Sequence, residues 1–433
     1  LSGGRDMTIM AITWVLLLAL GFPIAYALGM ASLAYFLTAH PELLPVLPQR
    51  VFAGLHSYAL IALPLFMFMG QIMNSTGITR RLVDLCLLLV GRLPGGLGMV
   101  NVISSMLFGG ISGSSTSDTA SIGSVLIPEM KKRGYPLHHA SGITVASSTM
   151  GMVLPPSIPM VIFAIAGQVS IGRLFLGGIL PGLIVGVLQL AAVAWMASRN
   201  HYPREEHPPS WSASGVLLMR SMHVLLMPIL LVGSIVFGIA TATESAAIGA
   251  LYAVAIGGLV HRELTWKKCL DALIQSARLS AQIMMIIAFS QVFVWMLALE
   301  RTPQALAEGL MALNLSPFML LLIIVALVLI MGTVIDVSPG ILLLTPIFMP
   351  VVAQAGISPV WFGVVFVGAL AVGACTPPVG TCLNVCAAIS GQSIGTIFRG
   401  ALPFLAANAI MLLLVILFPE LVLFLPDWLM PAS

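Results

Sequence analysis

Long apolar runs recur along the chain and alternate with short polar connections. Two of them, MTIMAITWVLLLALGFPIAYAL and LFLGGILPGLIVGVLQLAAVAWMA, contain no charged residue. A helix of about 20 apolar residues spans a hydrocarbon core of about 30 Å. The pattern therefore predicts an all-α polytopic membrane protein that is in contact with the lipid bilayer over most of its length.

The runs and the breaks between them also predict the order of elements. For the first half we expect helices near 8–21, 24–38 and 58–76, an amphipathic arm over 79–93, a re-entrant hairpin over about 98–130, a broken helix over about 140–168 and a helix near 174–198. The second half is expected to repeat this order, with a hairpin over about 317–352 and a broken helix over about 360–389.

The repetition is visible in the sequence itself. A shift of 222 positions places GMVLPPS (151–157) on GACTPPV (373–379), so that a glycine and a Pro-Pro pair coincide. The predicted repeats are 1–200 and 223–433, and a hydrophilic cytoplasmic linker over 201–222 joins them.

Basic residues predict the topology, because Lys and Arg accumulate in cytoplasmic loops. If the basic loops are cytoplasmic, only four of the 18 Lys and Arg residues stay outside, namely Arg5, Arg50, Arg173 and Arg301. Each half then makes an odd number of full crossings, provided that its hairpin enters and leaves on the same side. We therefore expect inverted repeats with both termini in the periplasm.

Composition supports the membrane class and excludes others. The chain is 59% hydrophobic and 8% charged, whereas soluble domains have about 25% charged residues. The five cysteines lie in or beside apolar segments, which is typical of packed core residues. No P-loop, nucleophile elbow, HExxH or dinucleotide fingerprint occurs in the sequence. The sequence predicts neither an enzyme nor a nucleic-acid-binding protein.

A polar stretch, GGISGSSTSD (109–118), interrupts two apolar runs. Non-helical backbone at membrane depth persists only where it is buried in protein or lines a wet cavity. The glycines permit a turn, which presents the hydroxyls of Ser112, Ser114, Ser115, Thr116 and Ser117. Oxygen-rich, nearly uncharged turns suit a hard cation such as Na⁺, and a helix starting at Thr119 offers its positive end to an anion.

Acidic residues at membrane depth are candidates for function by default. In the second tip, MGTVIDVSPG (331–340), Asp336 either couples ions or protons and holds the tip, or it caps the helix that opens at Pro339. Asp118 is predicted to cap the half-helix that follows it. For Glu244 we favour a structural role as a helix cap over a bridge between moving and static parts.

Each Pro-Pro pair is expected to break its helix, since proline lacks an amide donor and restricts the residue before it. The break frees the carbonyls of 151–153 in one half and 373–375 in the other. Prolines that merely kink packed helices are the alternative, but each pair follows by 27 residues a proline that ends the hairpin. The recurrence favours two pseudo-symmetric ion sites near the midplane, with substrate between them.

Four segments closely resemble the large membrane subunit, the DctM-like component, of tripartite ATP-independent periplasmic (TRAP) transporters in the ion-transporter superfamily. They are GGISGSSTSDTASIGSVLIPEMKKRGYP (109–136), LPPSIPMVIFA (154–164), GIATATESAAIGALYA (238–253) and DVSPGILLLTPIFMPVVAQAGISPVWFG (336–363). The resemblance covers nearly the whole chain from Met7. ATATES departs from it, because the family more usually has TPTE there.

The resemblance implies an elevator transporter, in which a core of two hairpins and two broken helices slides against a scaffold. It implies uptake of an organic anion, such as sialic acid, a C4-dicarboxylate or a sulfonate, coupled to a Na⁺ gradient across a bacterial inner membrane. It also implies two partners: a small four-helix membrane subunit, separate or fused, and a periplasmic substrate-binding protein.

The resemblance assigns site residues as well. The first Na⁺ site would comprise Ser112, Ser114, Ser115, Gly151 and Pro155, and the second Gly332, Asp336, Ser338, Gly373 and Thr376. Substrate would contact Thr116, Pro156, Ser157, Pro378 and Gly380. The competing interpretations are a stand-alone Na⁺- or H⁺-coupled carboxylate or anion carrier of the same superfamily, and a membrane scaffold without transport activity.

Overall fold

The computed structural model describes residues 2–200, 202, 211–312 and 315–431, and these residues form helices and connections without strands. The first half consists of α1 (Ser2–Ala19), α2 (Ile24–Ala39), a short 3-10 helix (Pro41–Val46), α3 (Leu47–Leu55), a second 3-10 turn (Tyr58–Ile61), α4 (Ala62–Ser75), α5 (Ile78–Val90), α6 (Gly96–Ser112), α7 (Ser115–Lys132), α8 (Leu137–Ser148), α9 (Met150–Val153), α10 (Ile158–Gly167) and α11 (Ile171–Asn200).

The second half repeats the order of a hairpin, a broken helix and a long helix. Its elements are α12 (Trp211–Val236), α13 (Ala242–Ala255), a π-helical turn (Ile256–Val260), α14 (Trp266–Leu299), α15 (Thr302–Ala312), α16 (Pro317–Val334), α17 (Val337–Gln354), α18 (Pro359–Gly373), α19 (Thr381–Ser390), α20 (Ile394–Leu417) and α21 (Glu420–Leu429).

Seven helices in the described part of the chain are long and apolar enough to cross a membrane. The segments Leu137–Val153 and Ile158–Gly167, bent by 42° at the first Pro-Pro pair, would together form an eighth span. These lengths confirm the prediction of an all-α polytopic membrane protein.

The predicted elements agree with the observed ones with three exceptions, one of which is α21, which follows the last predicted helix. The structure adds α3 and the 3-10 helix before it, which the apolar runs did not indicate. The predicted linker over 201–222 is also shorter than expected, because α12 already begins at Trp211. Residues 201 and 203–210 of that linker lie outside the described residues.

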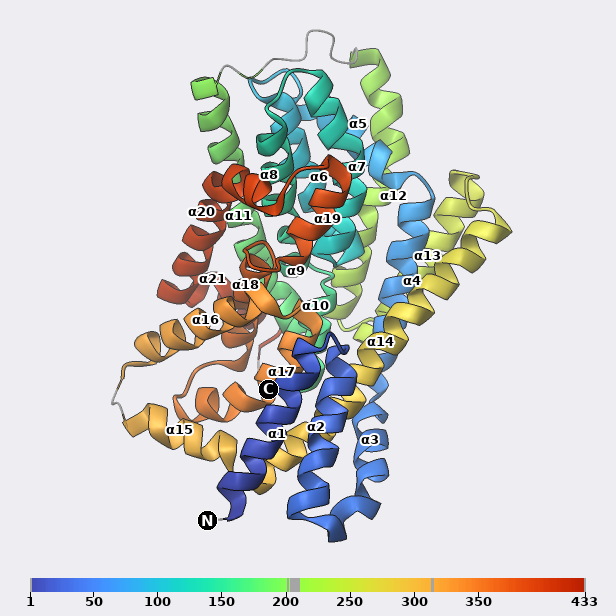
Figure 1. The fold of residues 1–433 in the computed structure, drawn as a ribbon. Helices are drawn as coiled ribbons and strands as arrows, with labels where there is room; N and C mark the ends of the chain where they lie inside the picture. The colour runs from blue at the N-terminus through green and yellow to red at the C-terminus, as the bar shows by residue number, and fades with distance from the viewer. Residues whose placement is uncertain (1, 201, 203–210, 313–314, 432–433) are drawn as a thin grey trace.

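The helices form two blocks (Figure 1). In the core block, the two halves interlock, since α8 packs against α20, α7 against α19 and α10 against α17. In the scaffold block, α4 packs against α13 and α14, and α14 packs against α2 and α3. Figure 1 shows the hairpin α6–α7 in the upper part of the core and α16–α17 in the lower part. The two halves therefore meet at the middle of the core.

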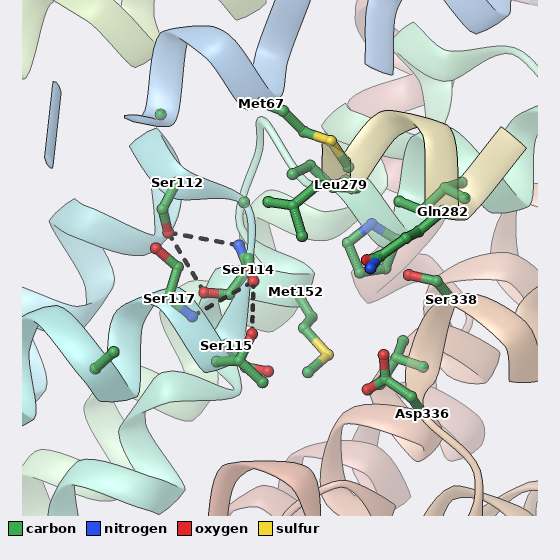
Figure 2. A pocket seen from close by; sticks show the side chains of 18 of the residues that line it. Met67, Ser112, Ser114, Ser115, Ser117, Met152, Leu279, Gln282, Asp336 and Ser338 are labelled. Atoms are coloured by element: carbon green, nitrogen blue, oxygen red, sulfur yellow. Dashed lines mark hydrogen bonds between the residues drawn. The ribbon is translucent and has the colours of Figure 1, made fainter. Parts of the chain in front are cut away.

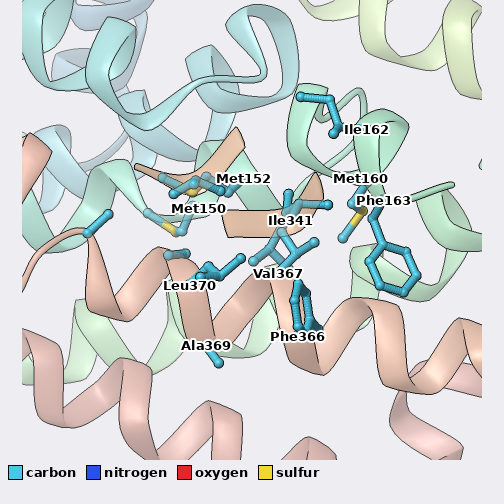
Figure 3. Packing of buried hydrophobic residues seen from close by; sticks show 14 of the residues in the cluster. Met150, Met152, Met160, Ile162, Phe163, Ile341, Phe366, Val367, Ala369 and Leu370 are labelled. Carbon is cyan, nitrogen blue, oxygen red and sulfur yellow. The ribbon is translucent and has the colours of Figure 1, made fainter. Parts of the chain in front are cut away.

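Side chains from both halves are packed together where the core helices meet (Figure 3). Phe163 of α10 lies 6.0 Å from Phe362 and 5.6 Å from Phe366 of α18, measured between ring centroids. Met160 and Ile341 are fully buried beside them. Since lipid is as apolar as these side chains, close van der Waals packing rather than exclusion from water holds the core block together.

Candidate functional site

The first tip is a two-residue turn between α6 and α7. Gly113 closes α6 with a left-handed φ of 60°, which glycine adopts without steric cost. Ser114 then caps α7, because its hydroxyl accepts a hydrogen bond from the Ser117 N–H at 3.5 Å. The stretch 109–118 is thus mostly helical, and its hydroxyls project from helix ends rather than from a long loop.

Asp118 was predicted to cap the half-helix after it, and this prediction is wrong. The helix starts at Ser115, so that Asp118 lies inside its first turn. The residue is fully buried, and neither carboxylate oxygen has a hydrogen-bond partner among the described residues. Ser114 takes the cap because Gly113 places the chain reversal just before it.

The first helix break spans 154–157 and contains a cis bond between Pro155 and Pro156. Ser157 ends it as the cap of α10: its hydroxyl accepts from the Met160 N–H at 3.3 Å and donates to the Met152 carbonyl at 2.5 Å. Ser157 is fully buried. The hydroxyl holds the break in this structure, and the contact of Ser157 with substrate stays a prediction.

Backbone contacts join the first tip to the first break. A Cβ placed on Gly109 would lie only 2.6 Å from the Cα of Gly151, so the backbones of α6 and α9 touch at two residues that have no side chain. The Ile158 N–H also donates to the Gly113 carbonyl at 3.2 Å. The contact brings the predicted residues Ser112, Ser114, Gly151 and Pro155 to one place.

The second half makes the same kind of contact. A Cβ on Gly373 would lie 2.7 Å from the Cα of Gly332, and the amides of Val379 and Gly380 donate to the Thr333 carbonyl at 3.1 and 3.3 Å. This break spans 374–380 and contains a second cis Pro-Pro bond.

Two carbonyls predicted to be freed by this break are occupied. The Gly373 carbonyl accepts from the Thr376 N–H at 2.9 Å, and the Ala374 carbonyl accepts from the Cys382 N–H at 3.2 Å. The hydroxyl of Thr376 donates to the Val372 carbonyl at 2.9 Å. These bonds give the unwound segment a defined shape in place of helical hydrogen bonds.

Asp336 occupies the N-cap position of α17, but its side chain makes no capping hydrogen bond. The helix opens at Val337 rather than at Pro339. Instead of capping, Asp336 lines a cavity together with Ser338 (Figure 2). The second of the two predicted alternatives for Asp336 is therefore wrong.

The cavity has a volume of about 500 Å³ and lies between the two tips and the scaffold. Six predicted site residues line it: Ser112, Ser114, Ser115, Thr116, Asp336 and Ser338. Pro156, Ser157, Pro378 and Gly380, which were predicted to contact substrate, are outside the lining, as are the backbone residues Gly151, Pro155, Gly332, Gly373 and Thr376. Thr116 is thus the one predicted substrate contact that faces the cavity.

Four carboxamide side chains complete the lining, and sequence reasoning missed all of them. They are Gln71 and Asn74 on α4, and Gln275 and Gln282 on α14. Their signal in the sequence is the spacing of three and seven residues, which places each pair on one helix face.

Charge is nearly absent from this lining. Asp336 is the only ionisable side chain among the described residues that border the cavity, and the remaining polar atoms belong to hydroxyls, carboxamides and backbone. Oxygen atoms of this kind can coordinate a hard cation. The Ser115 hydroxyl also accepts from the Cys382 thiol at 3.2 Å, which connects the first tip to the second half.

Glu244 lies away from this cavity and has a structural role, as expected. The Thr241 hydroxyl accepts from the Glu244 N–H at 3.3 Å, and the Glu244 carboxylate accepts from the Thr241 N–H at 2.8 Å. These reciprocal bonds form a capping box at the start of α13.

Two hairpin tips that meet two broken helices around a polar cavity define a membrane transporter built on inverted repeats. Residues 11–421 match the family model described as tripartite ATP-independent periplasmic transporter, DctM component. The chain belongs to this family, which confirms the resemblance seen in the sequence.

Known relatives match along nearly the whole chain. The chain is 33% identical over 414 residues to the 2,3-diketo-L-gulonate TRAP transporter large permease protein YiaN of Escherichia coli K12, a match of 95% of this chain and 96% of the relative. It is 35% identical over 405 residues to the C4-dicarboxylate TRAP transporter large permease protein DctM of Pseudomonas aeruginosa PAO1, with 93% and 94% covered. Since its relatives are transporter permeases, the chain is not an enzyme.

A solved structure supports the fold alone. The crystal structure of the YdaH transporter of Alcanivorax borkumensis, which has an unusual topology, matches with a TM-score of 0.66 and 17% sequence identity. The similarity covers 96% of this chain and 98% of that chain.

Proposed function

We propose that the chain is the membrane subunit that imports an organic anion together with Na⁺. The observation that carries the proposal is the cavity between the tips, which is rich in oxygen and has one ionisable side chain, Asp336, among its described lining residues. A site without Lys or Arg needs another source of positive charge for an anion. Bound Na⁺ and the amide ends of the half-helices α7 and α17 would supply it.

The two tips are the proposed ion sites. The first site uses Ser112, Ser114 and Ser115 with Gly151 and Pro155, and the second uses Gly332, Asp336 and Ser338 with Gly373 and Thr376. Two observations support this assignment: each hairpin touches its own broken helix through a pair of glycines, and four of the assigned residues carry a hydroxyl and line the cavity.

An elevator movement would carry the core block against the scaffold. It is supported by the position of the cavity, whose walls come from the tips on one side and from α4 and α14 on the other. A displacement of the core along the scaffold would take the tips, with ions and substrate, to the other side of the membrane.

The partners follow from the family. We propose a small four-helix membrane subunit, separate or fused, and a periplasmic protein that delivers the substrate. The complex would lie in a bacterial inner membrane with both termini of this chain in the periplasm. The two relatives are named for 2,3-diketo-L-gulonate and a C4-dicarboxylate, which are both organic anions; sialic acid and sulfonates belong to the same broad class.

Uptake into proteoliposomes tests the proposal. The chain and its small subunit are reconstituted, and radiolabelled organic acids are supplied with and without the binding protein and an inward Na⁺ gradient. Ser115→Ala and Asp336→Asn should weaken Na⁺-dependent uptake at least about tenfold, because each removes one oxygen ligand or its charge. Ser198→Ala is the control, since Ser198 is exposed on α11 away from the cavity.

Three results would contradict parts of the proposal. Uptake that does not need the binding protein would favour a stand-alone carrier. Coupling to protons instead of Na⁺ would overturn the ion sites. Unchanged Na⁺ dependence in both variants would show that the tips do not bind the coupling ion.

A further inference from the structure

Three glutamines of the scaffold face the cavity without a partner. Gln71 lies on α4, and Gln275 and Gln282 lie on α14. Within the described part of the chain, none of the three side chains forms a hydrogen bond with a protein atom. The fourth carboxamide, Asn74, differs from them because its oxygen accepts from the Ser121 hydroxyl at 3.0 Å.

These glutamines stand opposite the tips. Figure 2 shows Gln282 extending into the cavity near Ser338, with Leu279 and Met67 beside it. Gln71 and Gln275 also line a neighbouring hollow of about 290 Å³, which Asn74 shares. The carboxamide side chains of the scaffold therefore border both the cavity and this neighbouring hollow.

Gln275 and Gln282 are exposed and Gln71 is half-buried, so water in the open cavity can satisfy carboxamides that form no hydrogen bond with protein. The cavity-lining residues of α14 beside Gln282, namely Leu279, Ile283 and Ile286, are apolar, whereas Arg278 one turn before it is charged and lies outside the lining. A substrate in the cavity would exchange these contacts with water for its own hydrogen bonds to the three carboxamides.

The chemistry of a carboxamide selects among anions. Its N–H₂ group donates and its carbonyl accepts, so it complements a hydroxyl group, which also does both. A carboxylate only accepts, so it can use the N–H₂ groups but leaves the amide carbonyl oxygens without a donor, which a hydroxyl group can supply. The hydroxyls of the tips on the opposite wall complement hydroxyl groups in the same way.

We propose that Gln71, Gln275 and Gln282 form a carboxamide wall that binds the hydroxyl groups of the substrate, which is a hydroxylated carboxylate. This inference rests on the proposed function and narrows it. The volume of about 500 Å³ lies within the range of small-molecule sites. Because the wall belongs to the scaffold and the tips belong to the core, the substrate bridges the two blocks in this conformation.

Paired acids that differ only in hydroxyl groups test the proposal. The chain and its small subunit are placed in nanodiscs containing Na⁺, and thermal stabilisation is titrated with D-gluconate against hexanoate, glycerate against propionate, and malate against succinate. At least one hydroxylated acid should bind about tenfold or more tightly than its partner, because a site built for hydroxyls rejects the analogue that lacks them.

Substitutions of the glutamines then test whether these side chains cause the preference for hydroxylated acids. Gln275→Met and Gln282→Met should each reduce the preference for the hydroxylated acid about tenfold, while stabilisation by Na⁺ alone stays unchanged and reports correct folding. Gln291→Met is the matched control, since Gln291 lies on the same helix but packs against Gly54 of α3.

Two outcomes would overturn the inference. One is equal or tighter binding of the acids without hydroxyls; the other is an unchanged preference in both glutamine variants. In either case, Na⁺-dependent binding of an acid without hydroxyl groups would still support the proposed function. If no acid of either series binds although Na⁺ stabilises the protein, the inference fails together with the organic-anion part of the proposed function.

Discussion

The glycine contact of the second half should be a sensitive point of the site. A Cβ at Gly373 would lie 2.7 Å from the Cα and 2.8 Å from the carbonyl carbon of Gly332, and 2.9 Å from the carbonyl oxygen of Leu329. Favourable carbon contacts are about 3.5–4.0 Å long. All three atoms belong to backbone, so no change of rotamer relieves the overlap. We expect Gly373→Ala to cost about 3 kcal/mol, the upper end of typical overpacking.

Two further alanine substitutions make the prediction quantitative. At Gly332 the nearest atoms lie 3.2 Å from the new Cβ, so the expected cost falls to about 1 kcal/mol. At Gly395, near the start of α20, no atom lies within 4 Å. Gly395→Ala should therefore leave stability unchanged or raise it by up to about 1 kcal/mol, because alanine favours a helix over glycine.

Thermal unfolding followed by tryptophan fluorescence, with and without Na⁺, measures the relative stabilities of the three glycine variants. Gly373→Ala should melt lowest, and it should lose most of the stabilisation by Na⁺ because the hairpin no longer seats on the break. Radioactive Na⁺ binding to the same samples checks the second point. If Gly373→Ala melts like Gly395→Ala and keeps its response to Na⁺, the close glycine contact does not shape the ion site.

Three other substitutions test single interactions. Asp118→Asn should change the free energy of unfolding by less than about 1 kcal/mol in thermal unfolding, since the carboxylate has no described hydrogen-bond partner to lose; a much larger loss would reveal a bound cation. Asn408→Leu should cost about 1–3 kcal/mol in the same assay, because it leaves the buried Gln189, which donates to Asn408 at 2.6 Å, without that partner. The hydroxyl of Tyr202 forms a hydrogen bond with the His139 ring at 2.5 Å, and burial raises the pKa of this hydroxyl. As the pH rises, the unfolded chain therefore loses the Tyr202 proton before the folded chain does. The free energy of unfolding of the wild type should fall above about pH 10. Tyr202→Phe should weaken this fall in a melting-temperature profile against pH, and an identical profile would contradict it.

The hairpins and the helix breaks could be predicted from the sequence because their causes are local. Glycine at 113 permits a left-handed turn, the Pro-Pro pairs restrict the backbone, and repetition at a fixed shift favoured helix breaks over kinks in packed helices. The residue that caps α7 was harder to predict. Ser114 and Asp118 are both good capping residues, and only the left-handed turn at Gly113 determines which of them is used.

The scaffold side of the cavity could not be predicted because its causes are not local. A glutamine such as Gln282 in an apolar helix is compatible with a lipid-exposed end, a packed network or a cavity. Gln282 shares the cavity with both tips, and Asp336 of the second tip and Ser114 of the first are each far from it in the sequence. Only tertiary packing brings them together. The approach of Gly109 to Gly151 depends in the same way on how α6 packs against α9.

The two walls of the cavity have different physical origins, which, under the proposed function, separates ion binding from substrate recognition. The wall formed by the tips is shaped by glycine contacts and backbone hydrogen bonds, so that side-chain replacement on the scaffold should leave it intact. The scaffold wall consists of side chains on the regular helices α4 and α14, which tolerate replacement without a change of backbone. Gly373→Ala should therefore weaken the response to Na⁺ first, whereas Gln282→Met should change which acid binds and leave that response unaltered. Loss of both properties in both variants would mean that the two walls act as one unit.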